Sequence, residues 1–263
     1  MTAFKLPMYN EGNMMEGIFK YQKNLMDELV KRGKLAPYPA TINSKLGQEQ
    51  LKKVISWVIE ELGEASDQYN KAIDHYLNSP EQDSLAVILD EAFIEVADAL
   101  HFFIELMVFS GLEAEDVLAY YQALARERNL DNFITTDGLT TSDNYAQHTN
   151  TFDDPVRVTR HRSLAVKMGP MITPRLSDEL HIVIQLGMWE TVRSLTLTGN
   201  LLKKREWSTT ERETSLSAYQ LKLMESWLYF MKFVNLMGFD AKALYYYYER
   251  KNLVVQERIL NGY

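Results

Sequence analysis

The sequence predicts an all-α protein built from two tandem, divergent four-helix units packed into one body, and three observations support this. Gly and Pro number only 12 and 7 in 263 residues, whereas the helix-favouring Leu, Ala, Glu, Lys and Met are plentiful. Apolar residues recur at spacings of three and four along several long stretches. The second half of the chain also repeats the first half, weakly but in the same order.

The first half carries four stretches with helical periodicity. They cover residues 13–33, 47–78, 82–110 and 113–130. The sequence NSPEQDS, at residues 78–84, reads as a break between the second and third stretches. The first unit, residues 1–130, is therefore expected to contain four helices.

A polar segment separates the two halves. Residues 131–155 are rich in Thr, Asp and Asn and lack an apolar period, so they predict a connecting excursion. Helical pattern resumes afterwards, and residues 156–263 form the expected second unit. A hydrophobic content of 46% is enough for a sizeable core across both units.

The clearest trace of the repeat lies at the ends of the halves. His101–Tyr121 aligns without gaps on Leu228–Tyr248, and the alignment pairs Gly111 with Gly238. Chance similarity between amphipathic helices is the alternative explanation. If the repeat is real, each half contains the same turn between its last two helices.

Four acidic residues occur in pairs on two neighbouring predicted helices. Glu61 and Glu64 are three residues apart, as are Glu95 and Asp98, so each pair projects to one side of its helix. The second of these helices is apolar nearly all round, so we expect its acids, Glu91 included, to lie inside the fold or at a cleft. Such pairs are also common on solvated helix faces. The repeat pairs the four acids with Gln185, Met188, Lys222 and Glu225.

Four converging carboxylates would repel one another unless cations compensate. Oxygen ligands in a chain without Cys suit Mg²⁺ or Mn²⁺ better than Zn²⁺, and Mg²⁺ is commonly completed by substrate phosphates. A nucleotide is therefore the natural ligand. His101, one turn after Asp98, either lines the pocket or is a core histidine, and Gln22 and Trp57 are candidates for a base pocket.

The C-terminal stretch supplies cationic donors. Lys251, Asn252 and Arg258 precede a closing Asn-Gly-Tyr that ends at Tyr263. Lys and Arg provide the donors that phosphate oxygens require. The alternative is a helix whose basic last turn simply complements the helix dipole.

These motifs together resemble a known family. Glu61-Leu-Gly-Glu64, Glu95-Val-Ala-Asp98 with the following Leu-His-Phe, and the ending GFDAKALYYYYERKNLVVQERILNGY are similar to the all-α dimeric dUTPase and phage dCTPase/dUTPase family. That family is related to MazG-type nucleoside triphosphate pyrophosphohydrolases. The resemblance spans Gln22 to Tyr263, and the acidic motifs and the ending are its specific parts.

The resemblance implies Mg²⁺-dependent hydrolysis of dUTP, dCTP or both to the monophosphate and pyrophosphate. It implies metal ligation by Glu61, Glu64, Glu95 and Asp98, with Glu61 or Glu64 also activating the attacking water. It implies substrate binding by Gln22, His101, Lys251, Asn252, Arg258 and Tyr263. It further implies a homodimer, although an internal repeat could satisfy that interface within one chain. The family's Trp-Lys-x-Trp-Lys segment is missing here, which leaves base preference open.

Composition limits the other possibilities. A net charge of −8 argues against a broad nucleic-acid surface, and the absence of Cys excludes disulfides and thiolate zinc sites. No signal peptide or membrane-length apolar run is present, so we expect a soluble cytoplasmic protein. Three alternative functions are also consistent with the sequence. They are a MazG-like enzyme of other base preference, a di-iron carboxylate bundle using Asp98-x-x-His101, and a non-catalytic nucleotide-binding protein.

Overall fold

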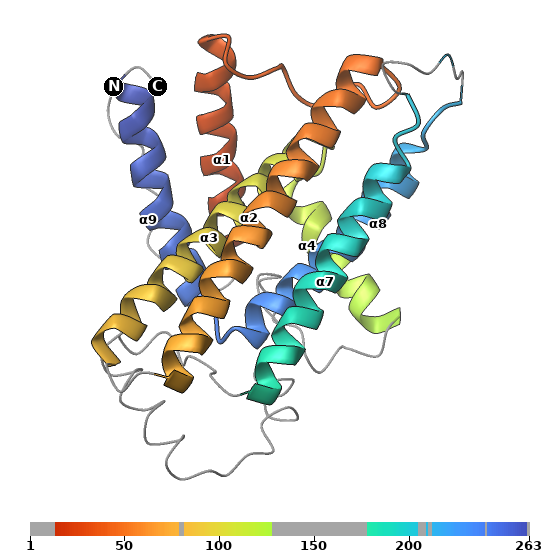
Figure 1. Cartoon of the computed structure of the whole chain (residues 1–263). Helices are drawn as coiled ribbons and strands as arrows, with labels where there is room; N and C mark the ends of the chain where they lie inside the picture. The colour runs from red at the N-terminus through yellow and green to blue at the C-terminus, as the bar shows by residue number, and fades with distance from the viewer. Residues whose placement is uncertain are drawn as a thin grey trace.

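The computed structural model describes residues 14–78, 82–127, 178–204, 209, 212–239 and 241–261. Within these ranges the chain forms seven α-helices and no β-strand, which confirms the predicted all-α class (Figure 1). The helices are α1 (Met14–Lys31), α2 (Lys45–Asn78), α3 (Gln82–Phe109), α4 (Ala114–Glu127), α7 (Asp178–Asn200), α8 (Leu216–Leu236) and α9 (Ala241–Leu260).

The four helices of the first half lie close to their predicted ranges. The predicted ranges 47–78 and 82–110 place the break correctly, because α2 ends at Asn78 and α3 begins at Gln82. Residues 131–155, predicted to be a connecting excursion, lie outside the described residues. The same holds for the start of the predicted second unit, whose first described helix is α7.

α3 lies at the centre of the molecule, and its sequence explains why. Phe93, Ala97, Phe103, Leu106 and Phe109 are all fully buried, and at helical spacing they are spread around most of the circumference of the helix. A helix that is apolar on nearly all sides needs neighbours on all sides. α3 accordingly packs against α1, α2, α8 and α9, with α2 running antiparallel along its length (Figure 1).

The turns that end α3 and α8 have the same backbone geometry. Gly111 and Gly238, which the alignment pairs, both adopt positive φ, at 74° and 101°. Glycine tolerates this left-handed conformation because it lacks a Cβ. The hydrogen bonds also correspond: Gly111 N to Val108 O (3.1 Å) with Gly238 N to Asn235 O (3.0 Å), and Leu112 N to Met107 O (3.0 Å) with Phe239 N to Val234 O (3.2 Å).

The last helix of each half packs against the opposite half. α9 lies along α3, α4 lies along α8, and α2 lies beside α7 (Figure 1). This reciprocal arrangement is what a pseudo-twofold relation between the halves would produce. It also carries the C-terminal residues of the chain to the acidic residues of the first half.

None of the described helices combines the length and the apolar character needed to cross a membrane.

Candidate functional site

Three of the four predicted metal ligands converge where α2 and α3 lie side by side. We call Glu61 of α2 with Glu95 and Asp98 of α3 the acid triad. One carboxylate oxygen from each lies within 4.8 Å of the other two. Oxygen donors grouped in this way fit a hard divalent cation such as Mg²⁺ or Mn²⁺.

Burial and mutual repulsion make the acid triad costly to ionise. Asp98 is only 8% exposed, and Glu61 and Glu95 are partly buried. Burial raises the pKa of Glu61 to about 8, with smaller contributions from the charges of Asp98, Glu64 and Glu95. Burial likewise raises the pKa values of Glu95 and Asp98. A cation placed among these groups would remove both penalties.

Glu64, the fourth predicted ligand, lies at the rim of the acid triad. Its side chain is exposed, and it is not one of the three converging carboxylates. Its charge nevertheless raises the pKa of Glu61, Glu95 and Asp98, which places it near them. It is therefore placed to contact a ligand that approaches the acid triad from the solvent side.

Glu91, expected inside the fold or at a cleft, does not lie inside the fold. Glu91 is exposed, and its neighbour Asp90 faces α9 instead. There Asp90 accepts hydrogen bonds from Tyr247 (2.6 Å) and from Arg250 (2.8 and 2.9 Å). At this turn α9 crosses the Asp90 side of α3, so Glu91 remains in solvent.

α9 brings a cation to the acid triad. The Lys251 Nζ donates to Asp98 Oδ2, forming an ion pair between the two halves of the chain. Burial raises the pKa of Asp98, and the Lys251 ammonium opposes that rise, with a further opposing contribution from Arg258. Arg258 itself is exposed and lies two turns further along α9. Cationic donors thus lie next to the acids.

His101 is buried next to α9. Its ring stacks on the Tyr248 ring with centroids 4.1 Å apart, and its Nε2 lies 3.4 Å from the Tyr248 carbonyl oxygen. Burial lowers the pKa of His101 to about 3, so the imidazole is neutral near pH 7. Such a ring can position neighbouring groups but does not supply a positive charge.

The predicted base-pocket residues lie in two places beside α3. Gln22 of α1 is 2% exposed and accepts a hydrogen bond from the Tyr248 hydroxyl at 2.9 Å. Trp57 of α2 packs against Phe102, with ring centroids 5.2 Å apart, and Lys53 lies 4.9 Å from the Trp57 ring centroid. The closing residue Tyr263 lies outside the described residues.

Sequence reasoning overlooked Glu105. This side chain is 6% exposed, and burial raises its pKa to about 7. A signal was present, because Glu105 is the sole acid in the otherwise apolar run from Phe102 to Phe109. Asn252 was predicted to bind substrate, but its nearly complete burial, at 1% exposed, could not be read from its position beside Lys251.

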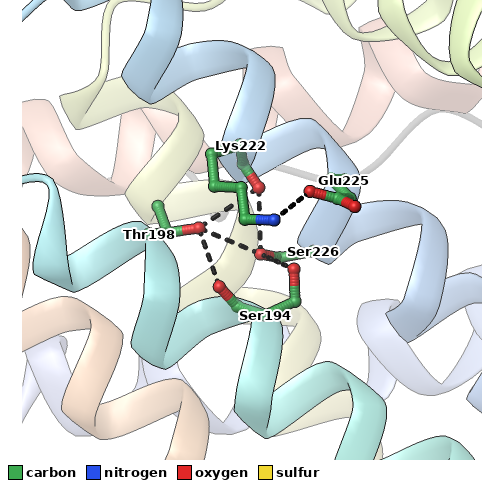
Figure 2. A network of polar contacts seen from close by, with 5 residues as sticks. All are labelled: Ser194, Thr198, Lys222, Glu225 and Ser226. Atoms are coloured by element: carbon green, nitrogen blue, oxygen red, sulfur yellow. Dashed lines mark hydrogen bonds and ion pairs between the residues drawn. The ribbon is translucent and has the colours of Figure 1, made fainter.

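The matching region of the second half has no acid triad. Figure 2 shows that Lys222 turns toward Glu225 and forms an ion pair with it. Ser226 Oγ donates to Ser194 Oγ at 2.9 Å and lies 3.1 Å from Thr198 Oγ1. Lys222 thus neutralises Glu225, which is the one acid among the four residues that the repeat pairs with the acids of the first half.

Comparisons with models of protein families, with curated proteins and with solved structures find no match to this chain. The geometry of the site is therefore the basis for a functional assignment.

Proposed function

We propose that the protein hydrolyses a deoxynucleoside triphosphate, dUTP or dCTP, to the monophosphate and pyrophosphate in a Mg²⁺-dependent reaction. The observation that carries this proposal is the acid triad with Lys251 of the opposite half beside Asp98. Acids that need a cation and an ammonium that can pair with phosphate are brought to one place. The motif resemblance described above points to the same chemistry.

Glu61, Glu95 and Asp98 would hold the metal, which neutralises phosphate charge and lowers the pKa of a bound water. Mn²⁺ would fit the same oxygen donors. Lys251 would exchange its carboxylate partner for a phosphate oxygen when substrate binds, and Arg258 would bind the far end of the triphosphate. The substrate's own negative charge would thereby take the place of Asp98 as the partner of Lys251.

Glu64 is the better placed of the two candidate bases, because it is exposed at the rim while Glu61 belongs to the triad. In the proposed step a water oxygen bonds to phosphorus, the bond to the bridging oxygen breaks, and Glu64 accepts the water proton. Hydrolysis in ¹⁸O-labelled water would show whether the α or the β phosphorus is attacked, because the label would enter the monophosphate or the pyrophosphate.

The decisive experiment is a panel of deoxy and ribo triphosphates assayed for pyrophosphate release with Mg²⁺ and with EDTA. We expect Mg²⁺-dependent turnover of dUTP or dCTP that Asp98→Asn reduces by about a hundredfold or more. Glu60→Gln is the matched control, since Glu60 is exposed on α2 next to the triad. Unchanged turnover in the Asp98 variant would contradict the proposal.

Other outcomes of the panel would favour the rivals. Turnover of another base with dUTP and dCTP inert would indicate a MazG-like enzyme. Nucleotide binding that is independent of Mg²⁺, without hydrolysis, would indicate a binding protein. Iron in the purified protein would favour a di-iron centre. The motif resemblance also favours a homodimer, which sedimentation analysis would test.

A further inference from the structure

Glu105 is a buried acid that the proposed hydrolysis does not use. It lies on α3, two turns beyond Asp98, and is 6% exposed. Its Oε1 has no hydrogen-bond partner among the residues that the structure describes. An unsatisfied buried acceptor costs free energy, so its presence calls for an explanation.

Polar groups surround Glu105 on the α9 side. The Tyr248 ring is stacked on His101, one turn before Glu105, and the Glu105 charge contributes to the raised pKa of the Tyr248 hydroxyl, whose main cause is burial. Asn252 lies beside Tyr248 and is 1% exposed. Within the described ranges, neither polar atom of the Asn252 amide has a partner of standard hydrogen-bond geometry. Two facing helices thus present unsatisfied polar atoms in the same neighbourhood.

On the α2 side, a cation lies between Glu105 and a pair of aromatic rings. The Lys53 ammonium interacts with the Glu105 carboxyl, and Lys53 also lies over the Trp57 ring. Trp57 and Phe102 are partly buried side chains packed against each other. Aromatic faces beside hydrogen-bonding groups are a common means of holding a planar heterocycle.

The spacing along α3 suits a nucleotide. A rise of 1.5 Å per residue places Asp98 and Glu105 about 10 Å apart along the helix axis. That separation is comparable to the distance between the first phosphate and the far edge of the base in a nucleotide. A triphosphate bound at the acid triad could therefore extend its base toward Glu105.

We propose that Glu105 reads the hydrogen-bonding edge of the base and selects cytosine over uracil. This inference rests on the proposed function and names the substrate, dCTP. A carboxylate only accepts hydrogen bonds, so the 4-amino group of cytosine can satisfy it. Uracil presents a carbonyl oxygen at the same position, and two acceptors would face each other. An enzyme site that leaves a buried polar group unpaired discriminates strongly against the wrong substrate.

The protonation state of Glu105 gives the selection a pH dependence. Burial raises the pKa of Glu105 to about 7, and the Lys53 ammonium opposes that rise. The other titratable groups nearby are Tyr248, which interacts with the Glu105 charge, and Tyr21 and His101, whose rings contact the Tyr248 ring. Burial raises the pKa of both tyrosines and lowers that of His101 to about 3, so none of the three changes charge near pH 7. The neutral acid can donate to the uracil carbonyl, so discrimination should increase as pH rises through 7.

The test compares kcat/KM for dCTP and dUTP at about pH 6 and about pH 8, around the pKa of Glu105. Wild type should favour dCTP at the higher pH and discriminate less at the lower pH. At about pH 8, Glu105→Gln should reduce the ratio of kcat/KM for dCTP to that for dUTP by about tenfold, because its amide can also donate to uracil. The ratio for this variant should not depend on pH. Glu60→Gln should behave as wild type.

The outcomes separate this inference from the proposed function. If wild type hydrolyses neither triphosphate with Mg²⁺, the proposed function fails and the role of Glu105 fails with it. If hydrolysis occurs but wild type prefers dUTP, or the ratio is the same in Glu105→Gln, the role of Glu105 alone is contradicted. Should the variant fold poorly, dCMP and dUMP binding to wild type at the two pH values gives the same comparison. If wild type bound dCMP and dUMP equally tightly at both pH values, the inference would be overturned.

Discussion

At the scale of single residues, Lys251 and a divalent cation compete for the same carboxylate. Lys251 pairs with Asp98 in the structure. A metal held by the acid triad would repel that ammonium, whereas bound phosphates would attract it. Lys251 should therefore oppose metal binding in the absence of nucleotide and favour nucleotide binding in the presence of metal.

Lys251→Met separates these two effects. We expect Mn²⁺ to bind the free variant several-fold more tightly, because the competing positive charge is gone. We expect KM for the triphosphate to rise by about tenfold, because a charge-assisted contact is lost. Electron paramagnetic resonance measures the first and steady-state kinetics the second. Lys242→Met on the exposed side of α9 is the control, and changes of the same sign for metal and nucleotide would contradict this role.

Glu105 should also make stability depend on pH. Its folded pKa of about 7 exceeds its ordinary value of 4.5, so the folded state binds more protons than the unfolded state between these values. Stability should therefore fall as pH rises from 4.5 to 7. Glu105→Gln should raise Tm relative to wild type by about 5 °C at pH 8 and by little at pH 4. Equal Tm differences at both values, measured by calorimetry, would refute this linkage.

Helix geometry predicted part of the arrangement of the acids. Glu95 and Asp98, three residues apart, do share a side of α3, but Glu64, which has the same spacing from Glu61, lies at the rim of the acid triad. Glu91 was misplaced because its exposure depends on where α9 crosses α3, which periodicity does not encode. Glu105 was overlooked because a single acid in an apolar run resembles a tolerated irregularity until its neighbours are known.

At the scale of elements, the repeated turns show how the chain determines the packing of its last helices. The hydrogen-bonded turns at Gly111 and Gly238 set the directions of α4 and α9. Both turns need a residue at positive φ, where a Cβ is unfavourable. The sequence alignment paired these two glycines, and the structure gives a physical reason for the pairing.

Gly111→Ala and Gly238→Ala should each lower the free energy of unfolding by roughly 1–2 kcal/mol. Gly63→Ala should instead raise it by about 0.5–1 kcal/mol, because Gly63 is in the middle of α2 and a Cβ there would meet no atom within 4 Å. Urea unfolding of the three variants provides the comparison. Stabilisation by alanine at either positive-φ position would show that the turn geometry is different.

Element boundaries were largely predictable because α1 to α4 have uninterrupted apolar periods. The break between α2 and α3 was placed correctly, because the predicted helical ranges end at residue 78 and resume at residue 82, as α2 and α3 do. Helix ends are otherwise predictable only to within one or two residues, as at the start of α2, which begins at Lys45 and not at residue 47.

At the scale of the whole molecule, the two halves have unequal roles. The first half contributes the acid triad, and the second contributes Lys251 through α9. In the second half Lys222 forms an ion pair with Glu225, so the corresponding position is already neutralised (Figure 2). Hydrophobic periodicity could not predict that α9 would pack against α3. Only the motif resemblance suggested that the C-terminal cations lie near the acids of the first half.

Lys222→Met should therefore separate stability from function. Removing the ammonium takes away the ion pair that Lys222 forms with the partly buried Glu225, so Tm should fall. Turnover with Mg²⁺ and the number of Mn²⁺ ions bound per chain should match those of wild type. A lost metal ion or a large loss of turnover in the folded variant would show that the second half takes part in metal binding.

The two similar halves belong to one chain, and this affects how the sequence of each half can diverge during evolution. In a symmetric homodimer, one codon change alters both copies of a position at once. Here Glu95 and Lys222, the residue that the repeat pairs with it, are encoded by separate codons. A substitution at one of these positions therefore leaves the other half of the chain unchanged. The reciprocal packing of α4 and α9 then preserves the shared architecture while one half diverges. A chain built in this way can carry a cluster of acids in one half only without losing its fold.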